Sequence, residues 1–187
     1  MKEFLLLGAA IAFGLTTLPA AAQQVTVSPL PQKITWGEGK AFDNTVTFTL
    51  VGDETADSDA VTLLREKLTT GDGGVELVIG ERGDEAVAEY EADIPEQKQG
   101  YYLSVGTDRV VIAGNDAAGT YYGVQTFLQV ASQPEVQSVT VTDYPSVLER
   151  GAIEGFYGNP WSETDRIRQF EFYGQNKMNI YIYGPKD

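Results

Sequence analysis

Two short segments near the C-terminus hold the residues best suited to contact a ligand. Gly155 and Tyr157 lie in the run Glu-Gly-Phe-Tyr-Gly, and Lys186 lies in the run Tyr-Gly-Pro-Lys-Asp. A glycine allows close approach to the backbone because it has no side chain. A tyrosine offers a flat apolar wall with one polar edge, and a lysine ammonium donates up to three hydrogen bonds. This combination suits the binding of a hydroxyl-rich ring such as a sugar.

The residue types also limit what reactions the chain can carry out. It contains no cysteine and no histidine, which excludes thiolate nucleophiles, imidazole bases and the usual zinc ligands. We therefore predict no metal and no cofactor. Glu154 could act as an acid, but a buried carboxylate at a strand end more often forms an ion pair, with Arg150 as a possible partner. Asp187 is expected to pair with Lys186 or with water, and Trp161 to pack its loop onto the following helix.

A strand, a helix and a second strand are predicted to position these segments. Residues 148–156 are typical of a strand, and 178–183 of another. Between them, Ser162 is a good N-cap and Asp165 stands where a capping box needs it. The helix should end at Gly174 and present its apolar residues to the core: Ile167, Phe170 and Tyr173. A strand, a short helix and a strand indicate a parallel βαβ unit, so the two ligand segments should follow strand ends at one edge of the sheet.

The preceding residues 23–145 predict a separate α/β sandwich with mixed strand directions. Strands are expected over 25–29, 34–36, 46–50, 75–79, 101–105, 110–113 and 136–141, and helices over 57–68, 84–92 and from about 117 to 131. The third helix would be capped by Asn115 or Asp116. Nothing in this region gathers acids, bases and hydroxyls as a catalytic site would.

Residues 1–22 have the form of a secretory signal peptide. Lys2 precedes an apolar run that ends in Pro-Ala-Ala-Ala, where small residues permit cleavage after Ala22. The alternative is an uncleaved membrane anchor, but the run is short for a span. We predict a secreted or periplasmic protein with no membrane association after cleavage. The net charge of −14 disfavours binding to nucleic acid or anionic lipid.

The runs around residues 150–162 and 176–187 resemble glycoside hydrolase family 84, the β-N-acetylglucosaminidases that include O-GlcNAcase. Residues 100–105 and 113–122 resemble the non-catalytic N-terminal domain of its bacterial members. The resemblance implies that residues 146–187 begin a catalytic (β/α)8 barrel. It also implies that the partners are glycoconjugates containing N-acetylglucosamine.

The resemblance implies a role for each residue of the ligand segments. Gly155 would bind a sugar hydroxyl through its carbonyl, Lys186 would bind the same sugar, and Tyr157 would line the pocket. The family hydrolyses terminal β-linked N-acetylglucosamine with retention, using the substrate's acetamido oxygen as nucleophile. Its two catalytic aspartates are adjacent and follow the fourth barrel strand, whereas this sequence stops after the second. We therefore expect no catalytic residue within the chain, and an inactive fragment.

Two other interpretations stay open at this point. The chain could be a non-catalytic carbohydrate-binding or assembly module, or a fragment of a family 20 hexosaminidase, which has a similar domain order. The Glu-Gly-Phe-Tyr-Gly run disfavours the family 20 alternative.

Overall fold

The computed structural model describes residues 26–155 and 159–184. Its strands are β1 (Lys33–Asp43), β2 (Phe48–Val51), β3 (Val75–Glu81), β4 (Tyr101–Val105), β5 (Arg109–Gly114), β6 (Glu135–Asp143), β7 (Gly151–Gly155) and β8 (Ile180–Gly184). Its helices are α1 (Ser58–Lys67), α2 (Ala117–Ala131) and α3 (Glu163–Gln175), with a 3-10 helix η1 (Glu85–Tyr90). No helix among these residues is long and apolar enough to cross a membrane.

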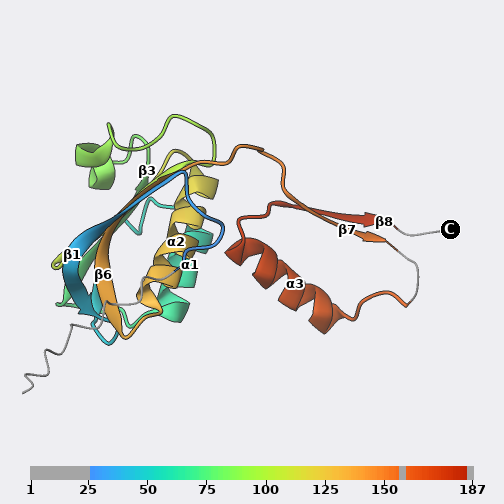
Figure 1. Cartoon of the computed structure of the whole chain (residues 1–187), viewed down its shortest axis with the longest axis horizontal. Coiled ribbons are helices and arrows are strands. Elements are labelled where there is room, and N and C mark those ends of the chain that lie inside the picture. Colours follow the sequence, from blue (N-terminus) through green and yellow to red (C-terminus); the bar gives the residue numbers. More distant parts are fainter. Residues whose placement is uncertain (1–25, 156–158, 185–187) are drawn as a thin grey trace, which may run out of the picture.

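Six strands form one mixed sheet in the order β1-β6-β4-β5-β3-β2. Strands β2, β3 and β5 are parallel, while β4 runs antiparallel to β5 and β6, and β1 antiparallel to β6. Helices α1 and α2 lie side by side on one face, and η1 belongs to the other (Figure 1). The predicted α/β sandwich with mixed strand directions is confirmed.

Alternation along the central strands divides the core into two layers. Leu77 packs in the cluster that includes the α1 and α2 side chains, whereas Val78 packs with Val87 of η1. Successive strand residues point to opposite faces, which gives one strand two buried surfaces. Such continuous apolar runs are typical of strands that are covered on both sides.

Helices α1 and α2 each begin with an aspartate cap. The Asp57 side chain accepts a hydrogen bond from the amide of Ala60, at 2.9 Å. At α2, Asp116 rather than Asn115 is the cap, and it accepts from the amide of Gly119 at 2.9 Å. Each cap satisfies an amide that has no partner within its helix.

Two elements predicted for the first domain, a strand and a helix, differ in the structure. The described part of the strand predicted at 25–29 is irregular, because Pro29 and Pro31 have no amide to donate to a neighbouring strand. The strand predicted at 34–36 is present but longer, as the 11-residue β1 that begins at Lys33. The helix predicted over 84–92 is the shorter 3-10 helix η1.

A second, two-stranded sheet pairs β7 and β8 in parallel, with α3 as the connection. This confirms the predicted βαβ unit. The Ser162 hydroxyl accepts from the amide of Asp165 at 3.2 Å and donates to its carboxylate at 2.6 Å, so the predicted cap is also confirmed. The helix runs one residue past Gly174, to Gln175.

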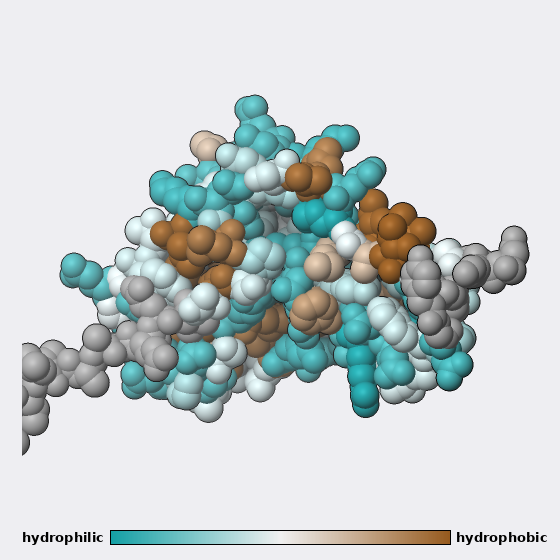
Figure 2. Space-filling view, turned by 45° about the vertical axis from the view of Figure 1, so that its right-hand side comes forward, coloured by the Kyte–Doolittle hydropathy of each residue, from teal (hydrophilic) through white to brown (hydrophobic). Residues whose placement is uncertain are grey.

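The predicted inward face of α3 is only partly buried. Tyr173 is 8% exposed, and the Phe170 ring packs against Tyr181 of β8 with centroids 4.9 Å apart, so both face the sheet as predicted. Phe170 nevertheless stays 46% exposed, and Ile167 is 52% exposed, so the predicted inward position is wrong for Ile167. Two strands are too narrow to cover the apolar face of a helix about three to four turns long. Ile153 and Ile182 of the sheet are also 70% and 50% exposed. Figure 2 shows hydrophobic surface on the right-hand side of the molecule, where this unit lies.

Candidate functional site

The carboxyl ends of β7 and β8 coincide. The register places Gly151 opposite Ile180 and Gly155 opposite Gly184, the last residue of each strand. Gly155 is exposed. The two predicted ligand segments therefore start from neighbouring positions at one edge of the sheet, the arrangement in which loops of parallel strands form sites. Tyr157 and Lys186 lie outside the described residues, so their roles, like that of Gly155, remain predictions.

Glu154, one residue before the strand end, is fully engaged in hydrogen bonds. It is 3% exposed, and Arg166 of α3 binds its two oxygens in a bidentate pair, at 2.9 and 2.8 Å. The hydroxyl of Tyr181 also donates to the carboxylate, and the amide of Trp161 donates to it at 3.2 Å. The carboxylate thus ties β7 to α3, to β8 and to the loop before the helix.

This environment keeps Glu154 ionised. The hydrogen bond from Arg166, assisted by those from Tyr181 and Trp161, lowers the pKa of Glu154 to about 2, although burial opposes the shift. A general acid must hold a proton near the working pH. Glu154 therefore has the properties of a structural anion, as expected from the sequence, rather than those of a proton donor.

Arg150 is not the partner of Glu154. Its guanidinium donates to the Val147 and Leu148 carbonyls at 2.6 and 3.0 Å, and to the Lys177 carbonyl at 2.9 Å. Glu154 lies near the carboxyl end of β7, whereas Arg150 immediately precedes the strand, so the pairing expected from the sequence is wrong. Strand neighbours four residues apart are separated by about 13 Å.

A buried polar cluster at the amino end of β8 was not foreseen from the sequence. The ammonium of Lys177 donates to Asp143 of β6 and to the Tyr101 hydroxyl of β4, both at 2.8 Å. Tyr101 also shares a 2.6 Å hydrogen bond with Thr126 of α2. Burial and the Asp143 charge raise the pKa of Tyr101 well above its usual value, so the phenol stays neutral. The cluster links the βαβ unit to the six-stranded sheet.

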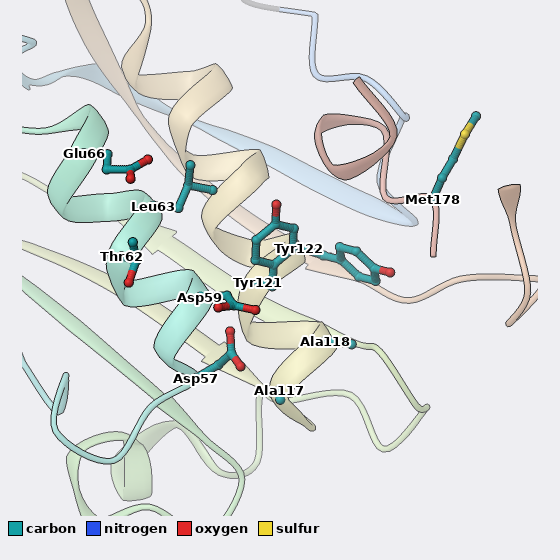
Figure 3. Close-up of a pocket in the computed structure, with 10 residues that line it drawn as sticks. All are labelled: Asp57, Asp59, Thr62, Leu63, Glu66, Ala117, Ala118, Tyr121, Tyr122 and Met178. Carbon is teal, nitrogen blue, oxygen red and sulfur yellow. The ribbon is translucent and has the colours of Figure 1, made fainter. Parts of the chain in front are cut away.

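A groove of about 480 Å³ lies away from the strand ends, against α1 and α2 (Figure 3). Three carboxylates line it, from Asp57, Asp59 and Glu66, together with Tyr121 and, from the turn after α3, Met178. Asp57 is already used as the α1 cap. No residue of β7 or β8 lines the groove, and no group of acidic side chains within the described ranges is arranged to hold a metal ion.

Two family models match consecutive parts of the chain. Residues 24–144 match the family model described as glycosyl hydrolase family 20, domain 2. Residues 150–187 match the model described as beta-N-acetylglucosaminidase. The first of these models alone covers more than half of the chain.

Solved structures show the same fold. CpGH84B is 30% identical, with a TM-score of 0.74, over 88% of this chain and 30% of that chain. CpGH84D is 24% identical, with a TM-score of 0.76, over 88% and 31%. A beta-N-acetylhexosaminidase from Bacteroides fragilis NCTC 9343 is 19% identical, with a TM-score of 0.62, over 86% and 32%.

The chain thus spans about a third of the length of each of these structures. The two models occur in order along it, and the similarity to CpGH84B extends over both. The chain therefore belongs to the hexosaminidase glycoside hydrolases of the family 84 type, in which a domain of the family 20 domain 2 kind precedes a β-N-acetylglucosaminidase segment.

Proposed function

We propose that this chain is the N-terminal part of an exported β-N-acetylglucosaminidase that removes terminal β-linked N-acetylglucosamine from glycoconjugates. The pairing of Gly155 with Gly184 carries the proposal. It brings the start of the Tyr157 segment next to the start of the Lys186 segment. A glycine carbonyl, a tyrosine and an ammonium at one strand edge suit the recognition of one sugar ring.

In the proposed mechanism these residues bind and orient the sugar, but they do not cleave the bond. The 2-acetamido oxygen attacks the anomeric carbon to give an oxazoline, and a water then opens it with retention of configuration. One aspartate would polarise the acetamido group, and its neighbour would act as acid and then as base. The 187 residues contain no two consecutive aspartates, and Glu154 is held ionised by Arg166. We therefore place the catalytic pair in a part of the enzyme outside these residues.

The proposed domain organisation assigns 1–22 to a signal peptide, 23–145 to a non-catalytic domain and 146–187 to the start of a (β/α)8 barrel. Exposed apolar surface supports the barrel, because Ile153 and Ile182 would be covered by neighbouring barrel elements. The parallel direction of β7 and β8 supports it as well, since barrel strands are all parallel.

The proposal is tested by an activity assay on two proteins. The product of the complete reading frame and the 187-residue chain are each assayed on 4-nitrophenyl N-acetyl-β-D-glucosaminide. We expect turnover by the complete product alone, and none on the matched β-D-glucoside, which lacks the acetamido nucleophile. Robust turnover by the 187-residue chain would refute the absence of catalytic acids. Equal rates on the two glycosides would refute the substrate-assisted mechanism.

A further inference from the structure

The only non-glycine residues with left-handed backbone in the described ranges are Gln99 and Lys177, with φ of 62° and 57°. Both lie where the βαβ unit meets the six-stranded sheet. Side chains rarely adopt this conformation, because Cβ crowds the following carbonyl. Residues that keep it are held there by their surroundings.

Lys177 occupies a position that usually belongs to glycine. At the end of α3 its amide donates to the Gly174 carbonyl at 3.0 Å, and the Met178 amide donates to the Tyr173 carbonyl at 2.8 Å. These two bonds form a Schellman motif, in which glycine is favoured at the left-handed residue. A glycine would satisfy the backbone here, so the lysine side chain must serve another purpose.

That side chain reaches into the core of the other unit. It is 6% exposed, and its ammonium contacts Asp143 and Tyr101, residues 34 and 76 positions away in sequence. Asp143 is itself 8% exposed and accepts a further bond from the Gln32 amide at 3.0 Å. The ammonium thus fixes the start of β8 at one point on the six-stranded sheet.

Arg150 joins the two left-handed residues. Its guanidinium donates to the Gln99 side-chain oxygen and to the Lys177 carbonyl, each at 2.9 Å. It also lies over the ring of Tyr122 at 5.5 Å. The Arg150 backbone amide donates a hydrogen bond to the side-chain oxygen of Asn179 at 2.9 Å. Both strands of the βαβ unit are therefore anchored at their amino ends.

We propose that Lys177 is a positioning residue, which sets the orientation of β7 and β8, and hence of the strand ends at Gly155 and Gly184, on the six-stranded domain. Desolvation offsets much of the attraction within a buried ion pair, so the pair adds little net stability compared with apolar packing, and we infer that its role here is to fix the orientation of the two units. Burial lowers the pKa of Lys177, which is consistent with that cost. The consequence for sugar binding rests on the proposed function, but the positioning itself does not.

Distance measurements between spin labels test the proposal on the 187-residue chain. The chain has no cysteine, so Thr107→Cys and Arg168→Cys place one label on an exposed site of each unit. The distance between the two labels is measured in the otherwise unchanged chain, in Lys177→Met and in Lys177→Gly. Lys177→Gly keeps the left-handed backbone favourable while it removes the ammonium. Lys98→Met, at an exposed lysine, is the matched control.

We expect one narrow distance distribution in the unchanged chain and in Lys98→Met. Both Lys177 variants should broaden it at least twofold, and so should Asp143→Asn/Lys177→Met, which leaves no unpaired buried carboxylate. Amide exchange in β4 and β5 verifies that the six-stranded sheet stays folded. A distribution as narrow in Lys177→Gly as in the unchanged chain would overturn the proposal, and so would a broad distribution in the unchanged chain. Neither result depends on whether the complete product hydrolyses a glycoside.

Discussion

Gly155 and Gly184 are paired residues at the carboxyl ends of β7 and β8. Because the strands are parallel, these two carboxyl ends lie at the same edge of the sheet. The polar anchors, Arg150 and Lys177, lie at the opposite, amino end of the unit. The structure thus separates the edge that is attached to the first domain from the edge that is proposed to bind sugar.

Replacing Glu154 by Gln should destabilise the βαβ unit in a pH-dependent manner. The folded pKa of Glu154 is about 2, below its ordinary value of 4.5. The carboxylate therefore stabilises the folded state above about pH 4.5, and this contribution is lost as the pH falls toward 2. Denaturation followed through the indole NMR signal of Trp161 should show a stability deficit for the variant that is clearly larger at pH 7 than at pH 3, where part of the contribution is already lost.

Glu149→Gln, at an exposed carboxylate two residues before β7, is the control and should have the same stability as the unchanged chain at both pH values. A deficit for Glu154→Gln that is the same at pH 7 and pH 3 would show that Arg166 and Tyr181 do not depress the pKa of the carboxyl in solution.

Replacing Gly151 by Ala should disrupt the pairing of β7 with β8. A Cβ at this position would lie 1.7 Å from the carbonyl oxygen of Ile180, so the strands must move apart. We expect the stability of the βαβ unit to fall by about 1–3 kcal/mol, as measured by amide exchange in β8. Gly71→Ala is the control, because its Cβ would meet only the Thr47 methyl at 3.6 Å. Unchanged protection of β8 in Gly151→Ala would contradict the register.

The local features of the chain were predictable from its sequence, whereas the long-range contacts were not. Ser162 marks the start of α3 as its N-cap, and the order strand, helix, strand indicates the parallel pairing of β7 with β8. The exposure of Ile167 was missed because periodicity identifies an apolar face but does not tell how much sheet is there to cover it. Lys177 was missed because its partners are distant in sequence, and Asn176-Lys177 offered no glycine to mark the left-handed position.

Of the predicted site, the structure establishes the common strand edge. The arginine that pairs with Glu154 is Arg166, on the following helix, rather than Arg150, which immediately precedes β7. The sequence alone could not show which of the two arginines pairs with Glu154, since both are close to it along the chain. The choice depends on the side of the sheet that α3 covers, which the fold decides.

Replacing Lys186 by Ala in the complete product should weaken catalysis without unfolding the enzyme. A hydrogen bond from a charged group contributes about 1.5–3 kcal/mol, which corresponds to a loss of about 10- to 100-fold in kcat/KM on the 4-nitrophenyl substrate. Lys98→Ala, at an exposed lysine of the first domain, should retain full activity. Equal activity of the two variants would remove Lys186 from the proposed sugar site.

The most direct test of the account is a crystal structure of the complete product with N-acetylglucosamine bound. The account predicts that the Gly155 carbonyl oxygen and the Lys186 ammonium both lie within about 3.2 Å of hydroxyls of one sugar ring. A sugar bound at another edge of the barrel, with neither group in contact, would contradict it.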